Sequence, residues 1–425
     1  MNFLVLGSGG REHAVIHKLS QSKIVDGLHC CPGNPGIAEL AICHSGNPCD
    51  PQAMLDLCLN EKIGVVFVGP EAPLVAGTAD TLRENGVLVM GPGKSGARLE
   101  GSKAFSKEFM KRHNIPTSSF DCCTDIESCK VALNKRTAPY VVKADGLAAG
   151  KGAFLLDTFE EALETCEMML ESNTLGDAGS IVVIEDFVPG IEMTVLAITD
   201  GHVVRVLPSS QDHKRVYDGD KGNNTGGMGA YSPVPWVDEP FMQKVTKEVL
   251  DPTVNGLKED GIPFCGVIYA GIMVKEDGSL SVLEYNVRLG DPETQVVLPV
   301  YNGDFGEVIL ACAKGELSSV AWPEPIQTAL GVVIASGGYP DKFEKGYEIS
   351  GLNSHIENTF IYHAGTAKNV NGEIVTSGGR VLTVVALANT LKEAKQLAYK
   401  RVKTITFKDM HFRNDIGDKS LKEDN

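Results

Sequence analysis

Two lysines flank a glycine-rich turn in residues 140–152, YVVKADGLAAGKG. The stretch from Tyr140 to Lys143 has the β-branched composition of a short strand, and the glycines after it allow several backbone N–H groups to face phosphate oxygens. Lys143 and Lys151 would supply countercharge to a triphosphate. The spacing is not that of a P-loop, because Gly152 stands where Ser or Thr is required. The segment indicates a phosphate-binding loop of another type, and a hairpin turn with solvated lysines is the alternative.

Glu284 and Asn286 are two residues apart on a predicted strand, so their side chains leave the same face. Mg²⁺ prefers oxygen ligands and commonly combines one or two carboxylates with substrate phosphates. Such a pair alone is more typical of a solvated strand face. Arg288, Asp291 and Glu293 follow at once in a turn that cannot continue the strand. This density of charge favours a site for a metal ion and its ligands.

A second glycine-rich loop, Gly7 to Gly10, follows the first predicted strand. It resembles the start of a dinucleotide fingerprint, but Glu12 occupies the third glycine position and no acidic residue ends the next strand. Nicotinamide binding is therefore disfavoured. What remains is a helix N-terminus with free N–H groups and Arg11 beside it, which can hold a single phosphate ester. A structural strand-to-helix turn is the alternative.

Two further segments carry polar groups that suit a nucleotide and an amino acid. Residues 209–232 form a long polar stretch with several glycines, and loops of this kind are usually functional or disordered. Asp212 in this stretch could hold an ammonium group. Glu185 ends a predicted strand and Glu192 follows a Pro-Gly turn, where a strand-end backbone can read adenine and a carboxylate can accept ribose hydroxyls. A flexible surface loop and an ordinary hairpin are the respective alternatives.

The elements that position these groups alternate between strands and helices. Apolar strands predicted at 3–6, 65–68 and 87–90 are each followed by a glycine-rich loop and a helical stretch, which predicts a parallel sheet with its loops gathered at the carboxyl edge. A helix predicted over 95–113 ends at Asn114-Ile-Pro116. The later expected helices are at 159–170, 242–257, after Pro292 and at 391–405. The later expected strands are at 181–187, 266–274, 280–286, 329–335 and 381–388, with two more between 191 and 207 joined by a turn at 199–201. We expect the charged tail after Phe412 to be mobile.

Composition limits the classes of function. The 425 residues suggest about three domains, and a formal net charge of −16 argues against a nucleic-acid or anionic-membrane surface. Phosphorylated small molecules bound in local basic pockets fit better. Eleven cysteines occur without a zinc-type pair or a disulfide framework, which indicates reduced thiols and a cytoplasmic location. No segment approaches the roughly 18 apolar residues of a membrane span.

Several motifs in this order resemble the ATP-grasp superfamily and, within it, the phosphoribosylamine-glycine ligase (glycinamide ribonucleotide synthetase) family. The resemblance runs nearly end to end. Its most specific strings are GSGGREHA at 7–14, PGNPG at 32–36, VGPEAPL at 68–74, VVKADGLAAGKG at 141–152, DHKR at 212–215, NTGGMGAYSP at 224–233 and NVRLGDPETQ at 286–295.

The resemblance implies a multidomain α/β and α+β protein. We expect a preATP-grasp, biotin-carboxylase-like domain over 1–102, an ATP-grasp pair over 103–325 with a small lid subdomain at about 120–190, and a small α+β domain over 326–425. The lid loop at 146–152 is expected to close and exclude water from a reactive intermediate.

The resemblance also implies roles for residues of this chain. ATP would be bound by Lys103, Lys143, Gly146, Gly150, Lys151, Gly152, Glu185, Val188 and Glu192, and Mg²⁺ or Mn²⁺ by Glu284 and Asn286. Substrates would be bound by Gly9, Gly10, Arg11, Asp212, Asn224, Thr225, Arg288 and Asp291, with Lys143, Arg288 and Asp291 acting in catalysis. Tyr269-Ala-Gly271 offers no carboxylate where many ATP-grasp enzymes have a metal ligand, so the complete ligand set stays open.

The implied reaction is the ATP-dependent ligation of glycine to 5-phosphoribosylamine in purine biosynthesis, through glycyl phosphate. A nucleotide-binding regulator without turnover and an ATP-grasp ligase or carboxylase for another acid are the alternatives. We expect small-molecule partners only, with neither nucleic acid nor membrane, and a monomer or weak homo-oligomer.

Overall fold

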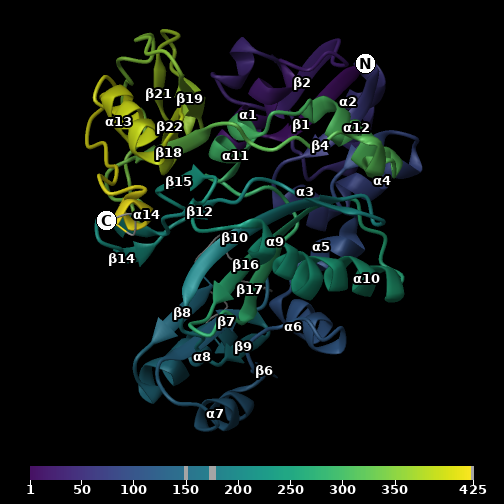
Figure 1. Ribbon diagram of the computed structural model, residues 1–425, viewed down its shortest axis with the longest axis vertical. Helices are drawn as coiled ribbons and strands as arrows, with labels where there is room; N and C mark the ends of the chain where they lie inside the picture. The colour runs from purple at the N-terminus through teal and green to yellow at the C-terminus, as the bar shows by residue number, and fades with distance from the viewer. Residues whose placement is uncertain (148–151, 172–178, 423–425) are drawn as a thin grey trace.

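A five-stranded parallel sheet forms the N-terminal part of the computed structural model, which describes residues 1–147, 152–171 and 179–422 (Figure 1). Both faces of the sheet are covered by helices, which explains why its strands are continuous apolar runs and not alternating ones. The order is β3-β2-β1-β4-β5, with β1 (Asn2–Gly7), β2 (Gly27–Pro32), β3 (Ile42–Cys43), β4 (Ile63–Val68) and β5 (Leu88–Met90). The first helices are α1 (Gly10–Leu19), α2 (Pro51–Asn60), α3 (Glu71–Ala76) and α4 (Thr78–Glu84).

The single helix predicted over 95–113 is wrong, because the chain forms α5 (Lys94–Gly101) and α6 (Lys103–Arg112) with a break at Ser102. Ser102 is extended, with φ −144° and ψ 112°, and its Oγ accepts the N–H of Phe105 at 3.1 Å. Asp145 accepts from Ser102 Oγ at 2.9 Å and from the N–H of Ala104 at 2.6 Å. These tertiary contacts start a new helix where local propensity would continue the old one.

A four-stranded antiparallel sheet lies at the opposite end of the molecule from the N-terminal sheet (Figure 1). Its order is β6-β9-β7-β8, with β6 (Phe120–Cys123), β9 (Val182–Glu185), β7 (Tyr140–Ala144) and β8 (Ala153–Leu156), and it packs on α7 (Ile126–Asn134) and α8 (Phe159–Glu171). Val141 is paired with Glu185 and Lys143 with Val183, so Lys143 and Glu185 are diagonal neighbours on adjacent strands.

A second antiparallel sheet lies between these two (Figure 1), in the order β11-β10-β16-β17. Its strands are β11 (Val204–Val206), β10 (Ile191–Thr199), β16 (Gly266–Val274) and β17 (Leu280–Asn286). The helix predicted at 242–257 starts earlier and consists of α9 (Glu239–Val245), a π-helical turn at Thr246–Leu250 and α10 (Asp251–Glu259). The chain then forms α11 (Thr294–Val300) and α12 (Phe305–Lys314).

The last sheet, in the order β12-β15-β18-β22-β19, includes strands from two distant parts of the chain. Its members are β12 (Gln211–Asp212), β15 (Gly229–Ser232), β18 (Thr328–Ala335), β22 (Arg380–Ala388) and β19 (Thr359–His363), with α13 (Leu391–Val402) packed against it. Two small hairpins, β13 (Arg215–Tyr217) with β14 (Lys221–Asn224) and β20 (Thr366–Lys368) with β21 (Ile374–Thr376), complete the strands. The polar segment 209–232 is therefore no structureless loop, and the sheet runs across the boundary predicted at 325. The three domain limits stay a prediction.

The prediction of a mobile tail after Phe412 is wrong for residues 413–422. Arg413 is fully buried and its guanidinium contacts Asp415 at 2.7 Å and Asp220 at 3.0 Å. A short helix, α14 (Asp418–Lys422), follows. The hydrophobic pattern of the sequence does not predict that this segment is ordered, because ion pairs with a residue about 200 positions earlier hold it in place.

Among the described helices, none is by itself long and apolar enough to cross a membrane. The pair α11 and α12, bent by 104°, meets the length and composition criteria together.

Candidate active site

A cavity of about 1200 Å³ opens between four sheets. These are the N-terminal sheet, the lid sheet β6-β9-β7-β8, the central sheet β11-β10-β16-β17 and the C-terminal sheet β12-β15-β18-β22-β19. It brings together residues as far apart in the sequence as Arg11 and Ser420. The predicted site residues that line it are Arg11, Lys103, Lys143, Gly146, Gly152, Glu185, Val188, Glu192, Asp212, Asn224, Thr225, Glu284, Asn286, Arg288 and Asp291.

Lys143 and Glu185 form the buried floor of the lid side of this cavity. Lys143 Nζ lies 2.9 Å from Glu185 Oε1 and donates to the carbonyl of Leu283 at 3.2 Å. Glu185 Oε2 lies 2.7 Å from Nζ of Lys107, which sequence reasoning missed, and accepts from Ser118 Oγ at 2.8 Å. Burial opposes the charge on Glu185, but Lys143 and Lys107 outweigh it and lower its pKa to about 2. Glu185 is therefore an anion that fixes two cations.

Lys103 begins α6 and points toward the glycine loop. Its Nζ donates to the carbonyl of Gly146 at 3.4 Å, and its backbone N–H donates to the carbonyl of Asp145 at 2.9 Å. Burial lowers the pKa of Lys103, while Glu284 acts in the opposite direction. The break at Ser102 thus places a cation beside the start of the loop.

Glu284 and Asn286 share one face of β17, as predicted, and both line the cavity. Burial raises the pKa of Glu284, but the surrounding cations, Lys214 first, lower it below its usual value. Asn286 Oδ1 accepts from Arg288 Nη2 at 3.1 Å. A carboxylate and an amide oxygen are the donors that Mg²⁺ and Mn²⁺ take, so this pair fits such an ion.

Arg288 is held by two glutamates that sequence reasoning missed as site residues. Its Nη2 lies 3.1 Å from Glu100 Oε1 and its Nε lies 3.4 Å from Glu71 Oε2. Burial opposes the guanidinium charge, yet Glu100 and Glu71 raise the pKa of Arg288 above its usual value. Burial also raises the pKa of Glu100, against the opposing effect of Arg288.

Lys214 forms the centre of an ion-pair group on the edge of the central sheet. Its ammonium contacts the carboxylate of Glu192. Burial lowers the pKa of Lys214, but Glu192 and Asp212 outweigh this effect and raise that pKa above its usual value. Burial raises the pKa of Asp212 to about 7, with Lys214 opposing the shift and Glu293 adding to it. The four residues line the same cavity.

Asp291 connects three parts of the chain. Its carboxylate accepts from Gln295 Nε2 at 2.8 Å and from the backbone N–H of Arg11 at 3.4 Å, and Arg380 Nη1 lies 3.3 Å from it. Burial raises the pKa of Asp291, but Arg380 and Arg11 outweigh it and lower that pKa. Arg380 lies on β22, far from any motif that sequence reasoning singled out.

The prediction that the first glycine loop has free N–H groups is wrong in part. Glu12 Oε2 accepts the N–H of Gly9 at 2.6 Å, and Glu12 Oε1 lies 2.5 Å from Arg11 Nε. The third glycine position thus carries an anion that folds back onto the loop. Gly10 packs closely against α11, and a Cβ there would lie 2.6 Å from Gln295 Nε2, so that amide would have to shift. Arg11 lines the cavity, whereas Gly9 and Gly10 are not among the described residues that line it.

Two predicted residues, Gly150 and Lys151, lie outside the described residues, so the closure of their loop stays a prediction. Asn224 and Thr225 reach the cavity from the segment around β14, and Thr225 Oγ1 donates to the carbonyl of Lys214 at 2.8 Å. The cavity residues to which the sequence had assigned no part in the site are Glu71, Glu100, Lys107, Lys214, Tyr269 and Arg380, whereas Glu293 belongs to the charged turn that the sequence did single out. Glu71 and Lys214 lie inside recognised motif strings, whereas Lys107 and Arg380 carry no local signal.

Two four-stranded antiparallel sheets enclose a cavity lined by lysines and a Glu-x-Asn pair, which is the arrangement of an ATP-grasp enzyme. Models of the phosphoribosylglycinamide synthetase N domain, ATP-grasp (A) domain and C domain match residues 1–100, 101–294 and 329–419. The chain therefore belongs to the phosphoribosylglycinamide synthetase family and is a ligase, which confirms the resemblance and the enzyme class expected from sequence.

Curated relatives agree along the whole chain. A phosphoribosylamine–glycine ligase of Halalkalibacterium halodurans is 44% identical over 423 residues, covering 100% of this chain and 98% of that protein. One from Vibrio vulnificus is 45% identical over 424 residues, covering 99% of each. The bifunctional purine biosynthetic protein PUR2,5 of Pichia angusta is 44% identical over 428 residues, and this chain spans 54% of its length.

Solved structures support the same fold. A phosphoribosylamine–glycine ligase from Thermotoga maritima superimposes with a TM-score of 0.87 at 34% identity, covering 98% of this chain and 100% of that one. The biotin carboxylase domain of a 2-oxoglutarate carboxylase from Hydrogenobacter thermophilus gives 0.76 at 17% identity, covering 97% and 91%. The second likeness concerns the fold alone, and it confirms the biotin-carboxylase-like architecture predicted from sequence.

Proposed function

We propose that the chain joins glycine to 5-phosphoribosylamine, with conversion of ATP to ADP and phosphate, to give glycinamide ribonucleotide in purine biosynthesis. The observation that carries this proposal is a cavity lined by Lys143 of β7, Lys103 of α6, the Glu284–Asn286 pair and the Arg288–Asp291 turn. These are the groups needed for a triphosphate, a divalent ion and an amino acid substrate. The names of the full-length relatives support the choice of substrates.

ATP is assigned to the side of the cavity formed by the lid and α6. Lys143 and Lys103 face the phosphates, and Gly146 and Gly152 are the described ends of the loop that covers them. The backbone at Val188 reads adenine, and Glu192 accepts the ribose hydroxyls. Because Glu185 is already occupied by Lys143 and Lys107, we assign it the task of holding Lys143 in place and not that of contacting adenine directly.

Glu284 and Asn286 would hold the divalent ion, Mg²⁺ or Mn²⁺, in this cavity. When bound, this ion neutralises charge on the phosphoryl group that is transferred. Arg288 Nη2 donates to Asn286 Oδ1 at 3.1 Å and so helps to fix the orientation of that amide.

The first chemical step activates a carboxylate, which is a poor electrophile. A carboxylate oxygen of glycine attacks the γ-phosphorus, the bond to the ADP oxygen breaks, and glycyl phosphate forms. Lys143 and Arg288 stabilise the charge on the transferred group. Asp212 holds the glycine ammonium group, and the position of Asp212 beside Lys214 sets the charge of that pocket.

The second step uses the amine of phosphoribosylamine as the nucleophile. The amine attacks the carbonyl carbon of glycyl phosphate, the C–O bond to phosphate breaks, and a proton leaves the nitrogen. Arg11 and the turn at Asp291 place this substrate, while Asn224 and Thr225 border the space on the C-terminal side. Three further expectations stay predictions. The chain is expected to be a monomer or weak homo-oligomer, to be cytoplasmic and to have no nucleic-acid partners.

Release of ADP in the presence of MgATP, phosphoribosylamine and one candidate acid at a time tests the proposal. We expect turnover with glycine only. One ¹⁸O should pass from carboxyl-labelled glycine to inorganic phosphate, because the bond that breaks in glycyl phosphate joins the carbonyl carbon to the bridging oxygen. Turnover with another acid in place of glycine would assign a different ligase, and nucleotide binding without turnover would assign a regulator. Lys143→Ala should raise the KM for ATP, whereas Lys275→Ala, at an exposed site, should not.

A further inference from the structure

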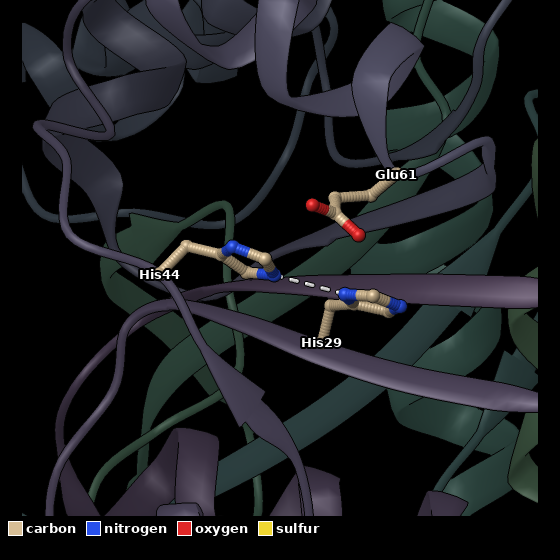
Figure 2. Close-up of side chains that lie close together, drawn as sticks. All are labelled: His29, His44 and Glu61. Atoms are coloured by element: carbon tan, nitrogen blue, oxygen red, sulfur yellow. Dashed lines mark hydrogen bonds between the residues drawn. The ribbon is translucent and has the colours of Figure 1, made fainter.

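Two histidines and a glutamate converge on the side of the N-terminal sheet that faces α2 (Figure 2). His29 Nδ1 and His44 Nε2 share a hydrogen bond at 2.9 Å, and one ligand atom from each of His29, His44 and Glu61 lies within 4.8 Å of the other two. Figure 2 shows the Glu61 carboxylate directed toward the two facing nitrogens. The three donors therefore surround one point.

Backbone hydrogen bonds hold the three residues in place. His29 lies within β2 and is 5% exposed. His44 directly follows β3, and its N–H donates to the carbonyl of Cys30 at 2.9 Å. Glu61 caps the C-terminus of α2, and its carbonyl accepts from Asn2 Nδ2 at 2.9 Å. The donors come from three successive elements whose positions are set by the sheet, so the site is largely preformed.

The ring geometry suits a shared cation. The imidazole planes are within 13° of each other and their centroids are 5.2 Å apart, which means that the rings meet edge to edge with nitrogen facing nitrogen. Zn–N bonds of about 2.0–2.1 Å place two nitrogens of a tetrahedral ion roughly 3.3 Å apart. Binding of an ion would therefore break the His29–His44 hydrogen bond and turn the His44 ring, so that both nitrogens face an ion on the Glu61 side.

We propose that His29, His44 and Glu61 bind one divalent transition-metal ion of the Zn²⁺ class. Two imidazoles and a carboxylate leave a fourth position for water, and imidazole selects Zn²⁺ over Mg²⁺, which prefers oxygen ligands. None of the three residues is among the described residues that line the active-site cavity, so the ion is distinct from the one at Glu284. It ties the end of α2 to the edge strand β3.

Zinc titration of the full chain tests this site. The chain is first stripped with a chelator and then titrated with Zn²⁺ calorimetrically in millimolar MgCl₂, which occupies the oxygen-ligand site. We expect one tight equivalent in the native chain and at least a tenfold weaker affinity in His44→Asn. His355→Asn, which removes an exposed histidine elsewhere, should bind as the native chain does.

Zinc should also raise the melting temperature of the native chain and of His355→Asn, but not of His44→Asn. Glu61→Gln serves as a second variant if His44→Asn fails to fold. The eleven free cysteines are competing ligands, so Co²⁺ replaces Zn²⁺ in a spectroscopic control. Co²⁺ d–d bands without thiolate charge-transfer absorption support the proposal. Strong thiolate bands, equal affinity in His44→Asn and Glu61→Gln, or no saturable binding would overturn it.

Discussion

Arg380 Nη1 donates to the backbone carbonyl of Asp291 at 2.6 Å and also lies 3.3 Å from the Asp291 carboxylate. The same nitrogen donates to the carbonyl of Gly226 at 2.5 Å. One guanidinium on β22 thus joins the turn after β17 to the glycine segment before β15. Because Asp291 also accepts from the N–H of Arg11, a residue of the C-terminal sheet helps to position both this turn and the start of α1, on the side of the cavity proposed to bind substrates.

Replacement of Arg380 by Gln should therefore impair the substrate side of the cavity and leave the nucleotide side intact. We expect kcat/KM for glycine or phosphoribosylamine to fall at least tenfold, because hydrogen bonds to charged groups contribute about 1.5–3 kcal/mol each. The KM for ATP should change little. Steady-state kinetics with each substrate varied in turn measures both, and Lys368→Gln, at an exposed site on β20, is the matched control. A rise confined to the KM for ATP would contradict this assignment.

Asp212 predicts a pH dependence in the use of glycine. Burial raises its pKa to about 7, so below that pH the group is neutral and attracts the glycine ammonium group less. The value of kcat/KM for glycine should rise with pH and level off above about 7, since this parameter reports the free enzyme. Asp212→Asn should lower the plateau and remove this limb. A limb of the same shape in Asp212→Asn would assign the titration to another group.

Glu185 predicts how acid destabilises the fold. Its pKa in the folded chain is about 2, below its ordinary value of 4.5, so the unfolded chain binds the proton more readily at intermediate pH. The contribution of Glu185 to the free energy of unfolding is present above about pH 4.5 and is lost as the pH falls toward 2. It amounts to on the order of 3 kcal/mol over that pH range. Urea unfolding between pH 5 and 3 should show a shallower pH slope in Glu185→Gln than in the native chain. Equal slopes would mean that Glu185 is not held as an anion by Lys107 and Lys143.

Glu284 predicts the metal dependence of turnover. Loss of its charge in Glu284→Gln should raise the Mg²⁺ concentration for half-maximal rate at least tenfold, because one of two protein ligands loses its anionic oxygen. Glu276→Gln, on the exposed turn of the same hairpin, should keep the native requirement. The turnover rate of each variant, measured against Mg²⁺ concentration at saturating ATP, distinguishes Glu284→Gln from Glu276→Gln. An unchanged Mg²⁺ requirement in Glu284→Gln would exclude this carboxylate as a ligand.

Asp145 predicts a link between helix capping and nucleotide use. It accepts from Ser102 Oγ and from the N–H of Ala104, so Asp145→Ala should cost about 1–2 kcal/mol of unfolding free energy and also raise the KM for ATP. Asp125→Ala removes a comparable cap, which accepts the N–H of Ser128 at 2.7 Å at the start of α7. That control should destabilise the chain without altering the KM for ATP. Equal kinetic effects in both variants would reduce Asp145 to a structural role.

Short-range patterns predicted much of the fold and the centre of the site. Continuous apolar runs indicated the parallel sheet, and the period of two on 280–286 placed Glu284 and Asn286 on one face. Lys143 was identifiable because a strand ends in a glycine-rich turn beside it. The error at 95–113 has the opposite cause, since the break at Ser102 depends on Asp145, which is 43 residues away.

The sequence by itself determined the family, the placement of Lys143, Glu284 and Asn286 on strands, and the overall α/β and α+β class, because these follow from motifs and periodicities within about fifteen residues. Tertiary structure alone decided that Lys107 shares Glu185 with Lys143, that Glu100 and Glu71 hold Arg288, and that Arg380 reaches Asp291. It also brought His29, His44 and Glu61 together. The physical reason is that a buried charge must find its partner in space, and the chain separation between partners leaves no pattern in the local sequence.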